Sequence, residues 1–142
     1  MQHEIQTKLP LLNAEGDLNE PGWCRHPLPV YRRDAVRAPK LRIKEWDYYL
    51  ITNGRFGLAL TIADNSYMGL DSISFLNFEE GWEVTTSPMR LLSMGKTGLP
   101  ESSAQGNVDS VGRAYGIHFH HAPGKRLLFA QMKNFGPEGS LT

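Results

Sequence analysis

Cysteine, net charge and long apolar runs are all scarce in this 142-residue chain, and each scarcity argues against a class of protein. The single cysteine, Cys24, cannot form an internal disulfide, which favours a reducing compartment over a disulfide-stabilised secreted domain. Lys and Arg together number 15, as do Asp and Glu, and this balance argues against nucleic acid as a partner. No apolar run is long enough for a membrane span or a signal peptide. We therefore expect a globular domain in the cytoplasm.

Motifs for common cofactor and catalytic chemistry are absent as well. The sequence contains no phosphate-binding loop, dinucleotide fingerprint, nucleophile elbow or cysteine-rich zinc pattern. Nucleotide-dependent and serine-hydrolase functions are therefore disfavoured, and we expect no cofactor. Hydrophobic residues still make up 40% of the chain, enough for one domain to bury a core.

Prolines concentrate in residues 1–40, at Pro10, Pro21, Pro27, Pro29 and Pro39. Because proline breaks helices and pushes the preceding residue towards extended geometry, these residues predict an extended N-terminal arm with one short turn or helix at 31–36. Arginine and lysine are dense from residue 25 to 44. They indicate either a surface for an anionic ligand or membrane, or a strap lying across the acidic face of the following sheet, and we favour the strap.

Residues 41–142 carry period-two patterns and no helical period of useful length. The strongest signal is Asn53-Gly54 between two apolar alternations, because this dipeptide favours a type I′ turn and so predicts a hairpin. Further strands are expected at residues 67–78, 82–86, 89–94, 111–121 and 126–133, with a loop at residues 95–110. The predicted fold class is all-β, an antiparallel meander forming a barrel-like or sandwich-like domain.

The strand after the hairpin separates large residues from small ones. Its large residues alternate and share one face: Phe56, Leu58, Leu60 and Ile62. The residues between them are all small: Gly57, Ala59, Thr61 and Ala63. This pattern predicts a core face, and an opposite face that an aromatic ring, another backbone or a ligand can approach closely.

The chain ends in GPEGSLT, residues 136–142, which is typical of a turn leading into a further strand. An open meander has two unpaired edges, and native β proteins usually close, cover or charge such edges. We therefore expect residues 41–142 to be the front part of a longer domain, and a homodimer that forms through open sheet edges. A complete domain with a frayed tail is the alternative.

Four segments carry a family signature: LLNAEGDLNEPGWCRHPLPVYRR, APKLRIKEWDYYLI, FGLALTIADNSYMGLDSISFLNFE and MGKTGLPESSAQGNV. Their most specific signals are Gly22-Trp23, the tetrapeptide at residues 46–49, the run 57–64 and Pro100. Together they resemble the N-terminal part of the family known as domain of unknown function 2804. The resemblance implies a β-barrel-like domain, distantly similar to the calycins and to the carotenoid hydratase and tocopherol cyclase families. It implies no established activity.

Two carboxylates are candidate catalytic residues. Asp71 shares a strand face with Ile73 and Phe75, and Asp64 closes an apolar strand. A carboxylate on an apolar face must be paired, hydrogen-bonded or raised in pKa, and the last state would make a proton donor to an alkene. The structural alternatives are that Asp64 caps a turn and that Asp71 pairs with an arginine of the arm.

Two histidines are the other catalytic candidates. On a strand, His118 and His120 point to one face, while Ile117, Phe119 and His121 point to the other. Such a pair can bind a first-row metal if Asp or Glu from a neighbouring strand completes the site, or can exchange protons near neutral pH. A structural pair is the favoured interpretation, so no metal is predicted; if one binds, His118 and His120 are its expected ligands.

Aromatic residues supply the candidate ligand contacts: Trp46, Tyr48, Tyr49, Tyr67 and Tyr115. Most aromatic residues of a β domain form its core, but some can line a cavity that holds a small molecule. Our first hypothesis is therefore a calycin-like domain that binds an apolar small molecule, a lipid or an isoprenoid. The alternatives are a hydratase or cyclase with an Asp71 or Asp64 proton donor assisted by the histidines, and a structural half-domain of a longer protein.

Overall fold

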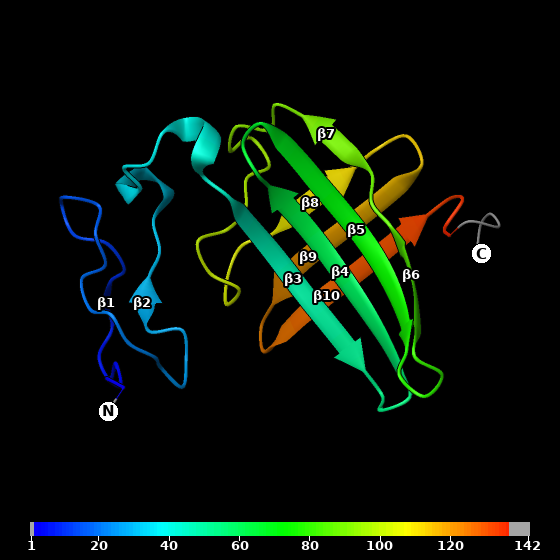
Figure 1. Cartoon of the computed structure of the whole chain (residues 1–142), viewed down its shortest axis with the longest axis horizontal. Coiled ribbons are helices and arrows are strands. Elements are labelled where there is room, and N and C mark those ends of the chain that lie inside the picture. The colour runs from blue at the N-terminus through cyan, green and yellow to red at the C-terminus, as the bar shows by residue number, and fades with distance from the viewer. Residues whose placement is uncertain (1, 137–142) are drawn as a thin grey trace.

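The computed structural model describes residues 2–136, and its main strands form two antiparallel sheets that face each other (Figure 1). The first sheet runs in the order β3 (Glu45–Thr52), β4 (Phe56–Asp64), β5 (Met68–Asn77) and β6 (Trp82–Thr86), and β7 (Met89–Leu91) also pairs with β5. The second sheet contains β8 (Val108–Val111), β9 (Tyr115–Ala122) and β10 (Lys125–Met132) in the order β10-β9-β8. The all-β, antiparallel prediction is confirmed. Over residues 2–136 the sheets stay separate instead of closing into a barrel, so the sandwich-like form of the prediction holds.

The predicted hairpin joins β3 to β4, but its turn differs from the expected one. Asn53 pairs with Phe56 through a backbone hydrogen bond of 3.1 Å, so Gly54 and Arg55 are the central residues. Of these two central residues only Gly54 has a positive φ, of 86°, which fits a type II′ turn better than type I′. The side-chain oxygen of Asn53 accepts hydrogen bonds from the backbone amides of Arg55 and Phe56 at 3.1 and 2.8 Å. These bonds hold Asn53 outside the turn centre.

The second sheet divides differently from the sequence prediction. Residues 111–121 were expected to form one strand after a loop at residues 95–110, but β8 begins at Val108 and a turn at Gly112 separates it from β9. The strand was missed because β8 has only four residues and directly follows Gly106-Asn107, a composition typical of a loop.

The N-terminal arm folds on itself beside the sheets (Figure 1). Two short parallel strands, β1 (Leu9–Pro10) and β2 (Pro29–Val30), pair within it, and η1 (Arg33–Ala35) and η2 (Lys40–Arg42) are single 3₁₀ turns. The expected short helix at residues 31–36 is therefore η1. Gly22 is needed for close backbone approach, because a Cβ there would lie 2.6 Å from the carbonyl oxygen of His3.

The arginines of the arm only partly form the expected strap. Arg33 pairs with Glu45 of β3, and the Tyr31 hydroxyl donates a hydrogen bond to the same carboxylate. Arg25 and Arg32 instead pair within the arm, with Glu4 and Asp34. The strap interpretation therefore applies to Arg33.

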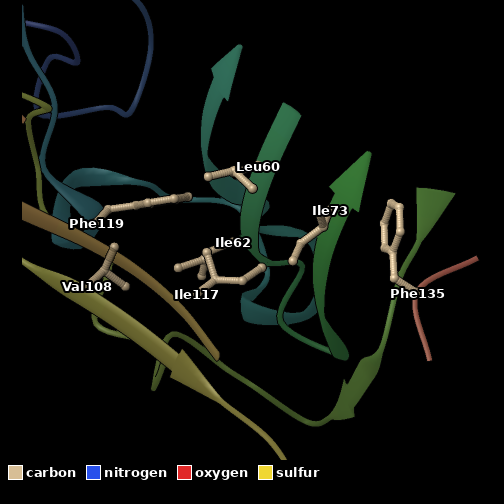
Figure 2. Close-up of a cluster of buried hydrophobic side chains, with 7 residues drawn as sticks. All are labelled: Leu60, Ile62, Ile73, Val108, Ile117, Phe119 and Phe135. Carbon is tan, nitrogen blue, oxygen red and sulfur yellow. The ribbon is translucent and has the colours of Figure 1, made fainter. Parts of the chain in front are cut away.

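The core lies between the two sheets (Figure 2). Its buried members come from both layers and from the segment after β10: Leu60, Ile62, Ile73, Val108, Ile117, Phe119 and Phe135. The Phe119 ring is fully buried and packs edge-on against Tyr49 of β3, with ring centroids 4.8 Å apart. Alternation along β4 and β9 thus buries the residues that the period-two pattern predicts.

The small face of β4 is approached closely by an aromatic ring, as predicted. A Cβ on Gly57 would lie 2.8 Å from the Phe78 ring. Leu58, on the opposite face, was assigned to the core but is 37% exposed. It lies near the beginning of β4 and lines a cleft between the layers, which do not cover it fully there.

Two further sequence predictions concern the ends of the chain and the membrane. The turn expected at residues 136–142 lies outside the described residues from 137 onwards. Among residues 2–136 there is no α-helix, and thus no helix of the length and apolar character needed to cross a bilayer.

We predict that Phe119→Ala lowers the free energy of unfolding by about 3–5 kcal/mol, because it leaves a cavity at the contact between the layers. The matched change Phe129→Ala, on the neighbouring strand with 57% of the residue exposed, should cost less than about 1 kcal/mol. Urea denaturation followed by tryptophan fluorescence measures both. Equal losses for the two variants would contradict the assignment of the core.

Candidate functional site

Asp71 is fully buried between the sheets and accepts hydrogen bonds from three strands. Arg90 of β7 donates to it from Nε at 2.8 Å and from Nη2 at 3.1 Å. The hydroxyls of Ser110 on β8 and Tyr115 on β9 donate to its Oδ2 at 2.8 and 2.7 Å. The carboxylate therefore ties the first sheet to the second.

The position of Arg90 explains the unusual pattern of β7. Its apolar residues Met89 and Leu91 are 68% and 88% exposed, while Arg90 between them points inward. Gly69 faces Arg90 across the strand pair, and a Cβ there would lie 2.7 Å from the guanidinium carbon. Glycine thus leaves the space that lets Arg90 lie against β5 and reach Asp71.

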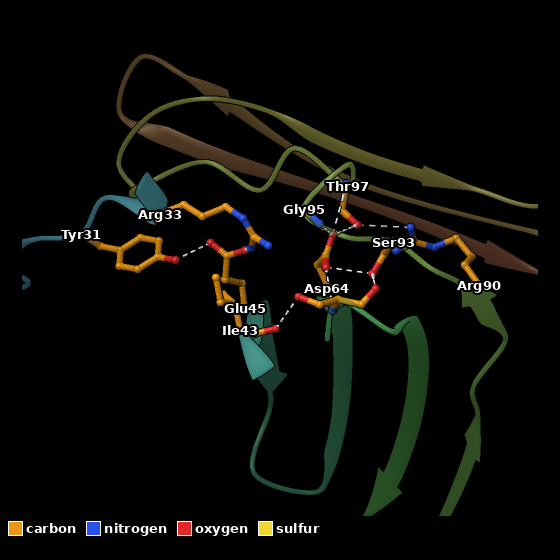
Figure 3. Close-up of polar contacts among 10 residues, drawn as sticks. Tyr31, Arg33, Ile43, Glu45, Asp64, Arg90, Ser93, Gly95 and Thr97 are labelled. Carbon is orange, nitrogen blue, oxygen red and sulfur yellow. Dashed lines mark hydrogen bonds and ion pairs between the residues drawn. The ribbon is translucent and has the colours of Figure 1, made fainter. Parts of the chain in front are cut away.

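Asp64, at the end of β4, accepts hydrogen bonds from four residues (Figure 3). Its partners are the amides of Ser66 and Gly95 and the hydroxyls of Ser93 and Thr97, at 2.8–2.9 Å. Burial alone would raise the pKa of Asp64, but these hydrogen bonds outweigh it and lower the pKa to about 2. The bond from the Ser66 amide is the turn-capping contact that the structural alternative predicts.

A continuous chain of contacts links the two carboxylates. The Thr97 hydroxyl donates to Asp64, and Arg90 Nη1 donates to the same hydroxyl at 3.2 Å while its other nitrogens bind Asp71. Burial, and the hydrogen bond donated to Asp71, raise the pKa of the Tyr115 hydroxyl, which keeps it a donor. Because all the partners named for both carboxylates are donors, this network suits ionised acceptors better than proton donors.

A second ion pair joins the layers at their edge strands. Arg126 of β10 lies 3.5 Å from Asp47 of β3, and its guanidinium carbon lies 5.6 Å from the Tyr49 ring centroid. Burial raises the pKa of Asp47, and the nearby Arg126 charge opposes that rise.

An apolar cleft opens between the layers at the end opposite Asp64. Its volume is about 390 Å³, and we call it the interlayer cleft. Its lining comes from β4, β5, β10 and the segment after β10: Leu58, Ile73, Phe75, Ala130, Gln131, Met132 and Phe135. Six of these seven side chains are apolar, which is the usual lining of a small-molecule site.

A more polar cleft of about 790 Å³ adjoins it along β10. The two clefts share Ala130, Gln131 and Met132 as lining. The second cleft adds the cationic side chains of Arg113 and Lys133. The apolar lining of the interlayer cleft therefore lies next to the cationic side chains of the second cleft.

The structure does not gather the five predicted ligand-binding aromatic residues in one place. Trp46 and Tyr48 are exposed on the outer face of the first sheet, and Tyr67 is exposed in the turn before β5. Tyr49 packs against the core, while Tyr115 binds Asp71 and lines the second cleft.

The predicted histidine pair lies on the outer face of the second sheet, away from the buried carboxylates. His118 and His120 point outward from β9, and both contact Asp109 of β8 at 2.6 Å. The carboxylates and the histidines therefore do not meet in one cavity.

Several residues of these sites were not predicted from the sequence. Arg90 stands alone between Met89 and Leu91, and on a strand this alternation places it on the face opposite to theirs. Ser110 and Asp109 were hidden because β8 was assigned to a loop; the alternation in Val-Asp-Ser-Val is the signal that marks them. The interlayer cleft has no local signal, because its lining comes from segments more than 50 residues apart in the chain.

Fold and clefts together define an all-β domain of two facing antiparallel sheets with an apolar cleft between them. A family model described as a domain of unknown function, DUF2804, matches residues 2–142, so the chain belongs to that family and the predicted resemblance is confirmed. No match was found among curated proteins or among solved structures. The likeness to calycins stays a prediction.

We predict that Asp64 makes folding stability depend on acid pH. Since its pKa falls from 3.8 to about 2 on folding, the ionised form stabilises the native state. This contribution, about 2 kcal/mol, is complete above the unfolded pKa and is lost as the pH falls towards 2. Urea denaturation between pH 7 and pH 2 measures it.

Asp64→Asn should be less stable than wild type at pH 7 and should lose stability less steeply on acidification. Asp17→Asn, at an exposed position of the arm, is the matched control and should keep the wild-type pH profile. A wild-type profile in Asp64→Asn would show that this carboxylate does not carry the effect.

Proposed function

We propose that this chain binds an apolar small molecule, a lipid or an isoprenoid, in the interlayer cleft. The observation that carries the proposal is an apolar cleft of about 390 Å³ between the layers of the sandwich. Its volume falls within the range of roughly 300–1,000 Å³ that is usual for small-molecule sites.

Burial of apolar surface supplies the binding energy. Each Å² of apolar surface removed from water contributes roughly 25 cal/mol, and a ligand in the cleft would cover exposed parts of Leu58 and Phe75 as well as its own surface. Loss of translational freedom and of ligand flexibility offsets part of this gain. A rigid or branched hydrocarbon would lose less on binding than a long flexible chain.

The second cleft suggests where a polar end would lie. Arg113 and Lys133 line it, and it shares β10 residues with the interlayer cleft. A carboxylate or phosphate at one end of the ligand would be attracted by these cations. The proposal therefore favours an anionic amphiphile over a pure hydrocarbon.

The hydratase or cyclase alternative receives less support. It needs a protonated carboxylate and a histidine near the same apolar cavity. Here Asp64 has a lowered pKa, Asp71 accepts hydrogen bonds from Arg90, Ser110 and Tyr115, and the histidines lie on the outer face. The presence of a cleft likewise favours a binding module over a purely structural half-domain.

We also propose a cytoplasmic location and a homodimer. The lone Cys24 is compatible with a reducing compartment. β3 and β10 each pair with a single neighbouring strand among the described residues, so each leaves one side of its backbone open for pairing with a second copy.

Filling the interlayer cleft should weaken ligand binding. We predict that wild type binds the uncharged fluorophore N-phenyl-1-naphthylamine saturably at one site per chain, and that Ala130→Phe lowers the affinity at least tenfold. The large ring would occupy the space between β10 and Phe75. Fluorescence titration measures both affinities.

A matched control separates filling of the cleft from the general effect of adding an aromatic ring to the chain. Ala104→Phe makes the same change in an exposed loop away from the cleft and should leave the affinity unchanged. Equal affinities for Ala130→Phe and wild type would place the probe elsewhere and contradict the proposed site.

The dimer can be tested without a variant. Size-exclusion chromatography with light scattering should give twice the 16.0 kDa mass of the chain, because open strand edges pair readily. A single species at the mass of one chain would contradict the homodimer.

A further inference from the structure

Three metal-ligating side chains converge on the outer face of the second sheet, outside the site proposed above. Asp109 of β8 lies directly opposite His118 of β9 in the strand register, and His120 follows two residues later on the same face. Cross-strand neighbours of this kind have Cβ atoms about 5 Å apart, so the sheet itself sets the spacing of the three side chains.

Their donor atoms lie close enough to share one ion. One donor atom from each of the three residues lies within 4.8 Å of the other two. His118 Nδ1 and His120 Nε2 both contact Asp109 Oδ1 at 2.6 Å. An ion held about 2.1 Å from each donor keeps donor atoms roughly 3–3.5 Å apart, so each contact needs to widen by less than about 1 Å.

The surroundings orient His118. Its ring lies 5.6 Å from the Phe129 ring of β10, centroid to centroid. A Cβ on Gly116 would lie 3.1 Å from His118 Nε2 and 3.5 Å from the Gln131 amide nitrogen. The nitrogen that faces away from Asp109 thus lies over Gly116, where the missing side chain leaves room for the ring.

The charge state of the cluster also suits a cation. The Asp109 carboxylate supplies negative charge, and it lies 2.6 Å from one ring nitrogen of each histidine. The side chains are 27–50% exposed, so an ion can reach them from solvent and they can adjust to it. Two imidazoles and one carboxylate are donors that zinc and its neighbours in the first transition row accept.

We propose that Asp109, His118 and His120 form a binding site for one divalent first-row transition-metal ion, zinc above all. Three protein ligands leave at least one coordination position open. Sites of that composition hold a water or a small anion at the open position, whereas purely structural zinc sites use four protein ligands.

The test is a titration of the full chain with Zn²⁺ by isothermal calorimetry, after treatment with a chelator and its removal. One ion per chain is expected. Asp109→Asn and His120→Asn should each weaken binding at least tenfold, because each replaces a direct ligand by a neutral amide, which is a poorer zinc ligand. Zinc should also raise the melting temperature of wild type and not that of these variants.

His121→Asn is the matched control, because His121 is exposed on the same strand but points to the opposite face. It should keep wild-type zinc affinity. Absence of binding at about 1 mM free Zn²⁺, which half-saturates even a site with a Kd of about 1 mM, would overturn the proposal. An equal loss in His121→Asn and His120→Asn would overturn it too, since binding would then not depend on the cluster. Circular dichroism of each variant confirms that it is folded.

Discussion

The ion pair between the fully buried Asp71 carboxylate and the partly buried Arg90 is the constraint on which the arrangement of the two sheets depends. Asp71 belongs to the first sheet, but two of its donors, Ser110 and Tyr115, belong to the second. Removing one partner of such a pair leaves an uncompensated buried charge and typically costs about 3–5 kcal/mol. The layers are therefore fastened at this end, and Arg126 with Asp47 joins them again at the edge strands.

The polarity of the inward-facing side chains changes along β4 and β5. Asp64 and Asp71 form the polar end, Leu60, Ile62 and Ile73 form the packed middle, and Leu58 with Phe75 faces the interlayer cleft at the other end. Strand alternation keeps all of these side chains on one face. The same alternation places the histidine cluster on the outer face of β9, so the proposed ligand and metal sites lie on opposite sides of one sheet.

The sequence predicts the parts of this structure that depend on local pattern. The hairpin follows from Asn53-Gly54 between two alternating runs. The position of Asp71 beside Ile73 and the shared face of His118 and His120 follow from period two. The turn type failed because the Asn53 side chain binds the backbone instead of entering the turn centre. The inward position of Arg90 was not predicted because it depends on Asp71, which lies 19 residues earlier in the chain on β5, the strand that pairs with β7.

Contacts between the layers were beyond local pattern altogether. The interlayer cleft joins Leu58 to Phe135, and nothing in either segment indicates the other. The partner for Asp71 was expected from the arm, where arginines are dense, yet the strand register brings Arg90 to it. Composition favours the arginines that are abundant in the arm, whereas the pairing of β7 with β5 places Arg90 next to Asp71.

The central claim is that the space between the layers holds an apolar molecule. Native mass spectrometry of the freshly purified chain tests it most directly, with the mass compared before and after denaturation. We predict an excess mass in wild type that denaturation removes and that Ala130→Phe lacks. An excess that persists unchanged in Ala130→Phe, or no excess in wild type, would contradict the account.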